Sequence, residues 1–203
     1  RRSRTRMAKL RHEIAAMAPS RATRRAGRTR HHVPSVAIAG YTNAGKSSLL
    51  NRLTGAGVLV ENALFATLDP TVRRAQTPDG RTYTLTDTVG FVRSLPTQLV
   101  EAFRSTLEEV GDADLLLHVV DVSHPDPEGQ VAAVRAVLAE IEGADAIHEI
   151  VVLNKADVAD PEVVARMRRR EPVSILVSAH TGEGLGALRE LIAAELPRPR
   201  EEI

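Results

Sequence analysis

The segment that most constrains the fold runs from Gly40 to Ser47 and reads Gly-Tyr-Thr-Asn-Ala-Gly-Lys-Ser. It matches the phosphate-loop pattern G-x-x-x-x-G-K-[ST] at every fixed position. The apolar run Ser35–Ala39 precedes it and the helix-permissive run Ser48–Leu53 follows, which is the strand, loop and helix context that the motif requires. In such a loop, backbone N–H groups and the positive end of the helix bind a phosphate. A plain glycine turn between a strand and a helix is the alternative that the motif alone leaves open.

Composition indicates one sizeable domain with an appendage. Apolar residues make up 43% of the 203 residues, and the absence of cysteine fits an intracellular protein. No apolar run approaches the roughly 18–20 residues of a membrane span. Ten arginines, Lys9 and Glu13 give residues 1–30 a charge of +10, whereas residues 31–203 carry −9. A basic arm on a mildly acidic body predicts a polyanionic partner for the arm.

The arm and the body differ in pattern as well as in charge. Four apolar residues of the arm recur at helical spacing and predict a helix over residues 1–18: Met7, Leu10, Ile14 and Met17. Its apolar stripe either packs on a neighbouring surface or accompanies direct nucleic-acid contact by the arginines. We therefore divide the chain into a basic helical linker over residues 1–32 and a nucleotide-binding domain over residues 33–203.

Strands and helices alternate along the body. The predicted strands are Ser35–Ala39, Thr71–Thr77, Thr82–Asp87, Leu115–Asp121, Glu149–Leu153 and Val173–Val177. The predicted helices are Gly45–Leu53, Pro96–Val110, Asp126–Glu142, Pro161–Arg169 and Gly184–Leu196. This order predicts a three-layer α/β phosphate-loop fold, with a mostly parallel sheet and one antiparallel hairpin strand. Ligands of such sheets bind outside the carboxyl ends of the strands, so the loops that follow the strands are the candidate site.

Two of those loops carry residues suited to a magnesium nucleotide. Asp87-Thr88-Val89-Gly90 follows a strand forty residues after the phosphate loop, where the Asp87 carboxylate can hold Mg²⁺ and the Gly90 N–H can sense a γ-phosphate. A hydroxyl from the loop Leu64–Thr71 can complete the magnesium shell, and Thr67 and Thr71 both qualify chemically. Such a loop orders with a triphosphate and loosens with a diphosphate. A simple turn cap is the competing interpretation of Asp87.

Two further loops predict that the base is guanine. Asn154-Lys155-Ala156-Asp157 follows a strand, and an ionised Asp157 can accept from the N1–H and 2-amino donors of guanine. Adenine offers neither donor and would leave the carboxylate unpaired, which costs on the order of 1–3 kcal/mol. Asn154 can hold the N7 edge, and the Lys155 stem can cover the ring. In Ser178-Ala179-His180, after the last strand, the Ala179 N–H can bond O6. An ordinary polar loop at a strand end is the alternative.

These segments, in this order, resemble the translation-factor-like GTPases, and longer strings resemble the HflX family in particular. The strings are Gly40–Leu50, Phe65–Thr71, Asp87–Phe91, Leu95-Pro96, Ala102–Glu109 and Ala113–Asp121. The resemblance covers roughly residues 33–196 and implies that Thr67 is the magnesium-binding threonine. It departs at Ser48, where the family usually has threonine, and at Ser94 and Thr97-Gln98, in a segment that usually carries more acid and a histidine.

The resemblance also implies the biological setting. Members of the HflX family are cytoplasmic GTPases that bind the large ribosomal subunit, with its ribosomal RNA, and can split idle or stalled ribosomes. They carry an N-terminal domain and a helical linker ahead of the GTPase domain, and residues 1–32 resemble the end of that linker. We accordingly expect a cytoplasmic monomer that binds GTP and GDP. The alternatives are an RNA-modification GTPase and a nucleotide-gated RNA-binding module with incidental hydrolysis.

Hydrolysis requires groups beyond those that bind the nucleotide. Phe91 stands where Ras-like enzymes place the glutamine that orients the attacking water, so we expect slow hydrolysis that a partner accelerates. In related GTPases an asparagine at the place of Asn43 helps to bind K⁺, although Asn43 can equally bond its own backbone. The predicted catalytic residues are Lys46, Thr67, Gly90 and Asn43, and the predicted metal ligands are Ser47, Thr67 and Asp87. The predicted GTP contacts are Gly40, Tyr41, Thr42, Asn43, Ala44, Gly45, Lys46, Ser47, Ser48, Phe65, Ala66, Thr67, Leu68, Asp69, Asp87, Thr88, Val89, Gly90, Asn154, Lys155, Ala156, Asp157, Ser178, Ala179 and His180.

Overall fold

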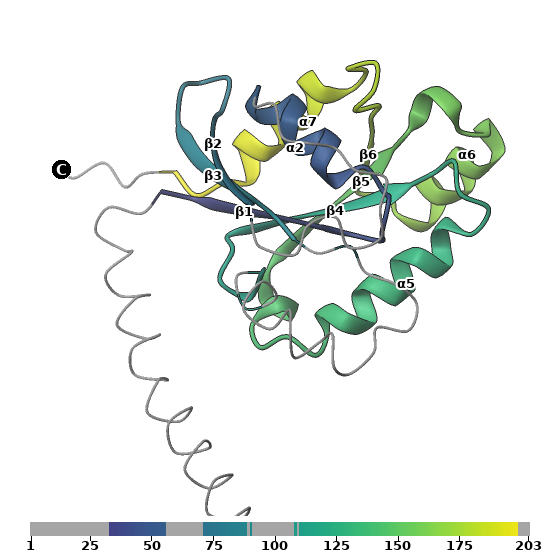
Figure 1. Ribbon diagram of the computed structural model, residues 1–203, viewed down its shortest axis with the longest axis horizontal. Helices are drawn as coiled ribbons and strands as arrows, with labels where there is room; N and C mark the ends of the chain where they lie inside the picture. Colours follow the sequence, from purple (N-terminus) through teal and green to yellow (C-terminus); the bar gives the residue numbers. More distant parts are fainter. Residues whose placement is uncertain (1–32, 56–70, 89, 91–107, 109, 199–203) are drawn as a thin grey trace, which may run out of the picture. The chain divides into compact units, whose positions relative to one another are not determined.

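A computed structural model describes residues 33–55, 71–88, 90, 108 and 110–198. Six strands within these ranges form one sheet in the order β2-β3-β1-β4-β5-β6 (Figure 1). The strands are β1 (Ser35–Gly40), β2 (Thr71–Gln76), β3 (Thr82–Asp87), β4 (Leu115–Asp121), β5 (His148–Asn154) and β6 (Ser174–Leu176). All neighbouring pairs are parallel except β2 and β3, which form the antiparallel pair at one edge. The predicted mixed sheet with one antiparallel hairpin is confirmed.

Helices cover both faces of the sheet. Within the described residues, the helices with defined bounds are α2 (Lys46–Thr54), α5 (Pro127–Leu138), α6 (Pro161–Arg170) and α7 (Leu185–Glu195), and the 3₁₀ turns are η1 (Ala144–Ala146) and η2 (Ala156–Val158). Figure 1 shows α2 and α7 on one face and α5 on the other. The side chains of α6 join those of α5 in one buried cluster, so α6 covers the same face as α5. The three-layer α/β fold predicted from the sequence is therefore confirmed.

The alternation of side chains along β1 explains how one strand serves two cores. Val36 and Ile38 pack with the apolar side chains of α2 and α7, whereas Ala37 and Ala39 pack with Val134 of α5. Successive side chains of a strand point to opposite faces, so every residue from Val36 to Gly40 is buried. All seven residues of β4 are buried as well, as its continuous apolar run predicts.

One helix is shorter than the sequence predicts. The periodicity predicts a helix over residues 126–142, but α5 ends at Leu138. Its start is as expected, because the Asp126 carboxylate accepts from Gly129 N at 3.0 Å and caps the helix. The chain after Leu138 turns into η1 through Gly143, whose φ of 86° is a left-handed value that glycine adopts without strain. The turn brings the chain into β5, which the apolar spacing of Leu138 and Ile141 does not reveal.

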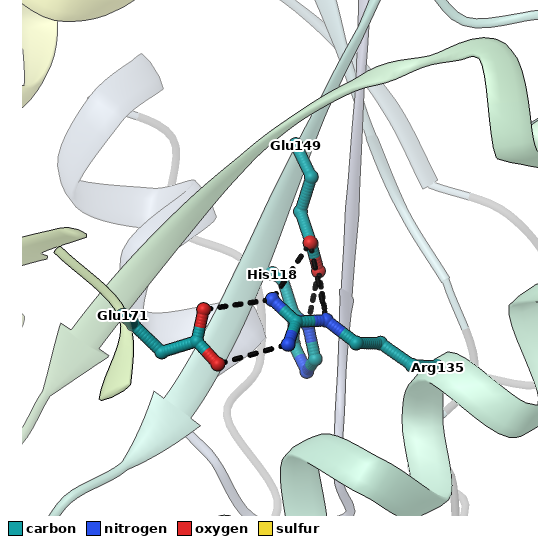
Figure 2. A network of polar contacts seen from close by, with 4 residues as sticks. All are labelled: His118, Arg135, Glu149 and Glu171. Atoms are coloured by element: carbon teal, nitrogen blue, oxygen red, sulfur yellow. Dashed lines mark hydrogen bonds and ion pairs between the residues drawn. The ribbon is translucent and has the colours of Figure 1, made fainter. Parts of the chain in front are cut away.

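A polar network fixes α5 against the sheet (Figure 2). Arg135 of α5 donates to Glu149 of β5 at 2.9 Å and to Glu171, directly after α6, at 2.8 Å. His118 of β4 is 1% exposed, and its Nδ1 lies 2.6 Å from Glu149 Oε1. Burial raises the pKa of Glu149, but the hydrogen bonds and charges of His118 and Arg135 together outweigh it and lower the pKa to about 2. One guanidinium therefore joins β5 to the end of α6.

Several predicted elements lie wholly or partly outside the described residues. These are the helix over residues 1–18, most of the loop after Gly55, and the helix over residues 96–110 up to its final residues. Glu108 and Val110 are helical, in agreement with the prediction for that end. The boundary between residues 32 and 33 stays a prediction. Within the described ranges, no helix has the length and apolar character that a membrane crossing needs.

Candidate nucleotide-binding site

The candidate site lies where four parallel strands end. Gly40, Asp87, Asp121 and Asn154 are the last residues of β1, β3, β4 and β5, which are neighbours in the sheet. Because the carboxyl ends of parallel strands meet at one edge, the loops that follow these residues come together there. Three of these residues belong to the predicted site, and Asp121 is an addition made by the structure.

The phosphate loop has the backbone shape that its glycines permit. Gly45 precedes the first residue of α2 with a φ of 95°, and Asn43 is also left-handed with a φ of 59°. A Cβ on Gly45 would lie 2.3 Å from Asn154 Nδ2, and a Cβ on Gly40 would lie 2.4 Å from the Val119 carbonyl oxygen. Side chains at either glycine would therefore push the loop away from β4 and β5. The glycines of the motif are required by both conformation and space.

Lys46 lies inside the loop as a buried cation. It is 7% exposed, and its Nζ donates to the Tyr41 carbonyl oxygen at 3.3 Å. Burial lowers the pKa of the Lys46 ammonium below its ordinary value near 10.5, while the charge of Asp87 acts in the opposite direction. A polyanion bound in the loop would give this buried charge the compensation that one backbone carbonyl supplies only in part.

The predicted magnesium ligands Ser47 and Asp87 are in direct contact. The Ser47 hydroxyl donates to Asp87 Oδ2 at 2.9 Å, and Asp87 is 1% exposed. A hydroxyl and a carboxylate beside a phosphate-binding loop are the oxygen donors that Mg²⁺ takes when it also binds substrate phosphates. The residues present therefore fit a magnesium ion. A turn cap at Asp87 does not describe this contact, since Asp87 ends β3 and bonds a side chain of α2.

Thr88 and Gly90 follow Asp87 and lie against the phosphate loop. The Thr88 hydroxyl donates to the Ile38 carbonyl oxygen at 2.7 Å, which ties the segment to β1. A Cβ on Gly90 would lie 2.9 Å from Thr42 Cα and 3.3 Å from Lys46 Nζ. Gly90 is therefore close to the loop and to the lysine that the sequence assigns to the outer phosphates.

Asn154 connects the loops after β5 and β6 to the phosphate loop. Its Nδ2 donates to the Ala44 carbonyl oxygen at 2.9 Å, and its Oδ1 accepts from Ala179 N at 3.0 Å. The side chain is 2% exposed, so both bonds are shielded from water. The sequence predicts that the Ala179 N–H bonds O6 of guanine. In this structure that N–H donates to Asn154 instead.

The candidate base acceptor Asp157 is held by the loop after β6. Ser178 Oγ donates to Asp157 Oδ1 at 2.7 Å, and His180 Nδ1 lies 3.3 Å from Oδ2. The Ser178 hydrogen bond holds the pKa of the Asp157 carboxyl below its ordinary value near 3.8, so the carboxylate is ionised at neutral pH. His180, one of the predicted GTP contacts, thus contacts the carboxylate that the sequence assigns to the base.

Asp121 orients Lys155. Asp121 is not among the site residues that the sequence predicts. Lys155 has a φ of 67°, and its Nζ donates to Asp121 Oδ2 at 2.7 Å. The other oxygen of Asp121 accepts from Ser123 N at 2.9 Å, so the carboxylate is held on both sides. An acidic residue at the end of a buried strand, at the same edge as the phosphate loop, is the signal that could have identified Asp121.

A cavity of about 410 Å³ lies between these elements. Its lining combines α2 with the loops after β5 and β6, and consists of Gly45, Ser48, Asn51, Arg52, Asn154, Lys155, Asp157, Val158, Ala179 and His180. Seven residues of the loops after β5 and β6 are predicted to contact the base. Five of them line the cavity, and Ala156 and Ser178 do not. The predicted contacts Phe65, Ala66, Thr67, Leu68, Asp69 and Val89 lie outside the described residues, as does Phe91.

Comparison with known proteins identifies the family. A sequence profile described as "50S ribosome-binding GTPase" matches residues 35–155, which contain the phosphate loop and the Asn154-Lys155 pair. The chain belongs to this GTPase family. It is 49% identical to GTPase HflX of Lacrimispora saccharolytica over 92% of the chain and 44% of that protein. It is 47% identical to GTPase HflX of Caldanaerobacter subterraneus subsp. tengcongensis over 98% of the chain and 45% of that protein. The resemblance to HflX is therefore confirmed.

The chain spans less than half the length of these two relatives, so it corresponds to a part of them. Among solved structures, Era of Aquifex aeolicus in complex with GDP and AlF₄⁻ superposes with a TM-score of 0.64 at 25% identity. That likeness covers 83% of this chain and 58% of Era. The family assignment and the fold therefore agree with each other.

Proposed function

We propose that this chain binds GTP and GDP and hydrolyses GTP as the switch domain of a protein that acts on the large ribosomal subunit. The observation that carries the proposal is Asn154, which bonds Ala44 of the phosphate loop and Ala179 of the last loop from one buried side chain. One side chain therefore joins the loop that we assign to the phosphates and the loop that we assign to the base, which supports the proposal. A nucleotide is the class of ligand that needs both.

Asp157 supports guanine as the base. Its carboxylate is ionised at neutral pH and lines the cavity, although Ser178 and His180 already contact its oxygens. Each carboxylate oxygen has two lone pairs, so both can still accept from the N1–H and 2-amino donors of guanine. Adenine has an acceptor where guanine has N1–H, which leaves the carboxylate opposed to a lone pair.

Mg²⁺ bound by Ser47 and Asp87 would neutralise charge on the β- and γ-phosphates during hydrolysis. Lys46 contributes a second positive charge from within the loop, and the loop N–H groups orient the phosphates. The left-handed Asn43 is our candidate for a K⁺ ligand, and Thr67 is our candidate for completing the magnesium shell. Phe91 offers no group that could orient water, so we expect slow hydrolysis by the isolated chain.

Base recognition is tested with Asp157→Asn. The amide offers a donor in place of one acceptor, so GTP binding should weaken by about 100-fold while xanthosine triphosphate binding improves. Isothermal titration with GTP, xanthosine triphosphate and ATP measures both effects. Asp145→Asn, on the exposed side of η1, is the matched control that should leave all three affinities unchanged. Unchanged GTP binding by Asp157→Asn would show that the guanine site lies elsewhere.

Action on the ribosome is tested by GTP turnover with and without large ribosomal subunits. We expect stimulation by the subunits, and we expect the association to weaken steeply with added salt and when GDP replaces GTP. Turnover in K⁺ against Na⁺ at equal ionic strength tests the role of Asn43. An affinity for the subunit that does not depend on the bound nucleotide would favour an RNA-binding module in the cytoplasm over a switch.

A further inference from the structure

Arg52, near the end of α2, donates hydrogen bonds to two backbone carbonyls of the loop after β6. Its Nε donates to the Ala179 carbonyl oxygen at 2.8 Å, and its second terminal nitrogen donates to the His180 carbonyl oxygen. Neither carbonyl belongs to α2, and the two partners lie 127 and 128 residues further along the chain. A planar guanidinium that donates in two fixed directions orients its acceptors more tightly than an ammonium does.

The hydrogen bonds from Arg52 to these carbonyls also determine the direction of the neighbouring backbone N–H groups. In a planar trans peptide, C=O and N–H point in opposite directions, so orienting the Ala179 carbonyl also orients the His180 N–H. The Ala179 N–H is oriented separately by Asn154 Oδ1 at 3.0 Å. The two N–H groups of this segment are therefore oriented from two sides, that of Ala179 by Asn154 and that of His180 through the Ala179 carbonyl that Arg52 holds.

Arg52 is itself held in place and lies on the cavity. Arg189 of α7 donates to the Arg52 carbonyl oxygen at 2.6 Å, so the end of α2 is braced against α7. Arg52 lines the same cavity as Asp157 and Ala179. Since α2 begins at Lys46, the lysine that we assign to the phosphates and the arginine that orients the loop after β6 belong to one helix.

We propose that Arg52 is a positioning residue for recognition of the 6-oxo group of the purine. It holds the Ala179–His180 peptide so that the His180 N–H is presented to O6, while Asp157 binds the 2-amino side independently. This inference rests on the proposed function, because it concerns the same nucleotide. Arg52 need not touch the nucleotide, and its effect passes through the two carbonyls.

The test separates O6 recognition from 2-amino recognition by using three nucleotides. GDP carries both groups, IDP carries only the 6-oxo group, and the diphosphate of 2-aminopurine riboside carries only the 2-amino group. For Arg52→Ala we expect binding of GDP and IDP to weaken equally, by about tenfold, with little change for the 2-aminopurine nucleotide. Arg52→Lys should recover part of the loss, because an ammonium can still reach one carbonyl.

Arg74→Ala is the matched control, since Arg74 is an exposed arginine on the edge strand β2. Amide signals of Ala179 and His180 in nitrogen-15 spectra of the nucleotide-free variants should move with Arg52→Ala and not with Arg74→Ala. Equal weakening of all three nucleotides would indicate general damage and overturn the proposal. Unchanged GDP binding by Arg52→Ala would overturn the Arg52 proposal and leave the proposed function in place. A wild-type chain that does not prefer GDP to ADP would overturn both.

Discussion

Asn154 Nδ2 lies 2.9 Å from the Ala44 carbonyl oxygen, and this bond joins the end of β5 to the phosphate loop. A Cβ on Gly45 would come within 2.3 Å of the same nitrogen, so the bond exists only because residue 45 is glycine. Loops that we propose contact different parts of a nucleotide are thus joined to each other by a side chain of the protein itself. Preorganisation of this kind reduces the ordering that binding requires.

Asn154→Ala should destabilise the nucleotide-free chain as well as weaken GTP binding. The substitution leaves the buried Ala44 carbonyl and Ala179 N–H without their partner, which costs about 2–4 kcal/mol of unfolding free energy. Urea unfolding measures the loss. Gln76→Ala, at an exposed position of β2, is the control and should change the unfolding free energy by less than about 0.5 kcal/mol. A variant as stable as the control would contradict the bridging role.

Gly45→Ala and Gly55→Ala should differ although both glycines have positive φ. Gly55 has a φ of 69° with open space around its Cβ position, so alanine there should cost about 1–2 kcal/mol of backbone strain. Gly45→Ala adds a collision with Asn154 and should in addition abolish GTP binding. Thermal unfolding and nucleotide titration on the pair separate strain from site geometry. Equal nucleotide affinity in the two variants would show that the close approach is unimportant.

Ser47→Ala should change the magnesium dependence of nucleotide binding. The substitution removes the hydroxyl that bonds Asp87 and that we assign to the metal. We expect the Mg²⁺ concentration needed for half-maximal GTP binding to rise about tenfold, with GDP binding in the absence of metal nearly unchanged. Ser47→Thr retains a hydroxyl and should restore the wild-type dependence. A magnesium dependence that is the same for alanine and threonine would remove Ser47 from the metal site.

Lys46→Met should abolish nucleotide hydrolysis and yet spare or raise the stability of the nucleotide-free chain. Burial lowers the pKa of Lys46, so the unfolded chain binds a proton that the folded chain releases between the lowered pKa and about 10.5. Wild-type stability should therefore rise with pH in that window, and the methionine variant should lack this rise. Urea unfolding at several alkaline pH values measures the slope. A variant that is less stable at neutral pH would indicate that Lys46 supports the empty loop.

Glu149→Gln should lower stability at neutral pH and cancel part of the acid sensitivity. The pKa of Glu149 is lowered from about 4.5 to about 2, so its stabilisation is present above pH 4.5 and is lost as pH falls through 2. We expect a loss of about 2 kcal/mol at pH 7 that shrinks towards pH 2. Glu140→Gln, on an exposed position after α5, is the control. A difference that does not change with pH would contradict the lowered pKa.

Local pattern was sufficient where the relevant interactions are between neighbours in the sequence. The apolar run of β4 and the phosphate loop with its glycines both follow from adjacent residues. The end of α5 did not follow, because Leu138 and Ile141 keep helical spacing while the chain already turns towards β5. Periodicity reports which side chains can share a face, and the turn at Gly143 is decided by where β5 must begin.

By itself, the sequence determined the fold class, the identity of the phosphate loop and the residues that follow each strand. These properties depend on spacing along the chain, and spacing is written in the sequence. Only the tertiary structure decided that Arg52 reaches Ala179 and His180, that Asp121 holds Lys155, and that Asn154 occupies the Ala179 N–H. Such contacts join residues 25 to 128 positions apart, and no local rule relates side chains that the order of strands in a sheet brings together.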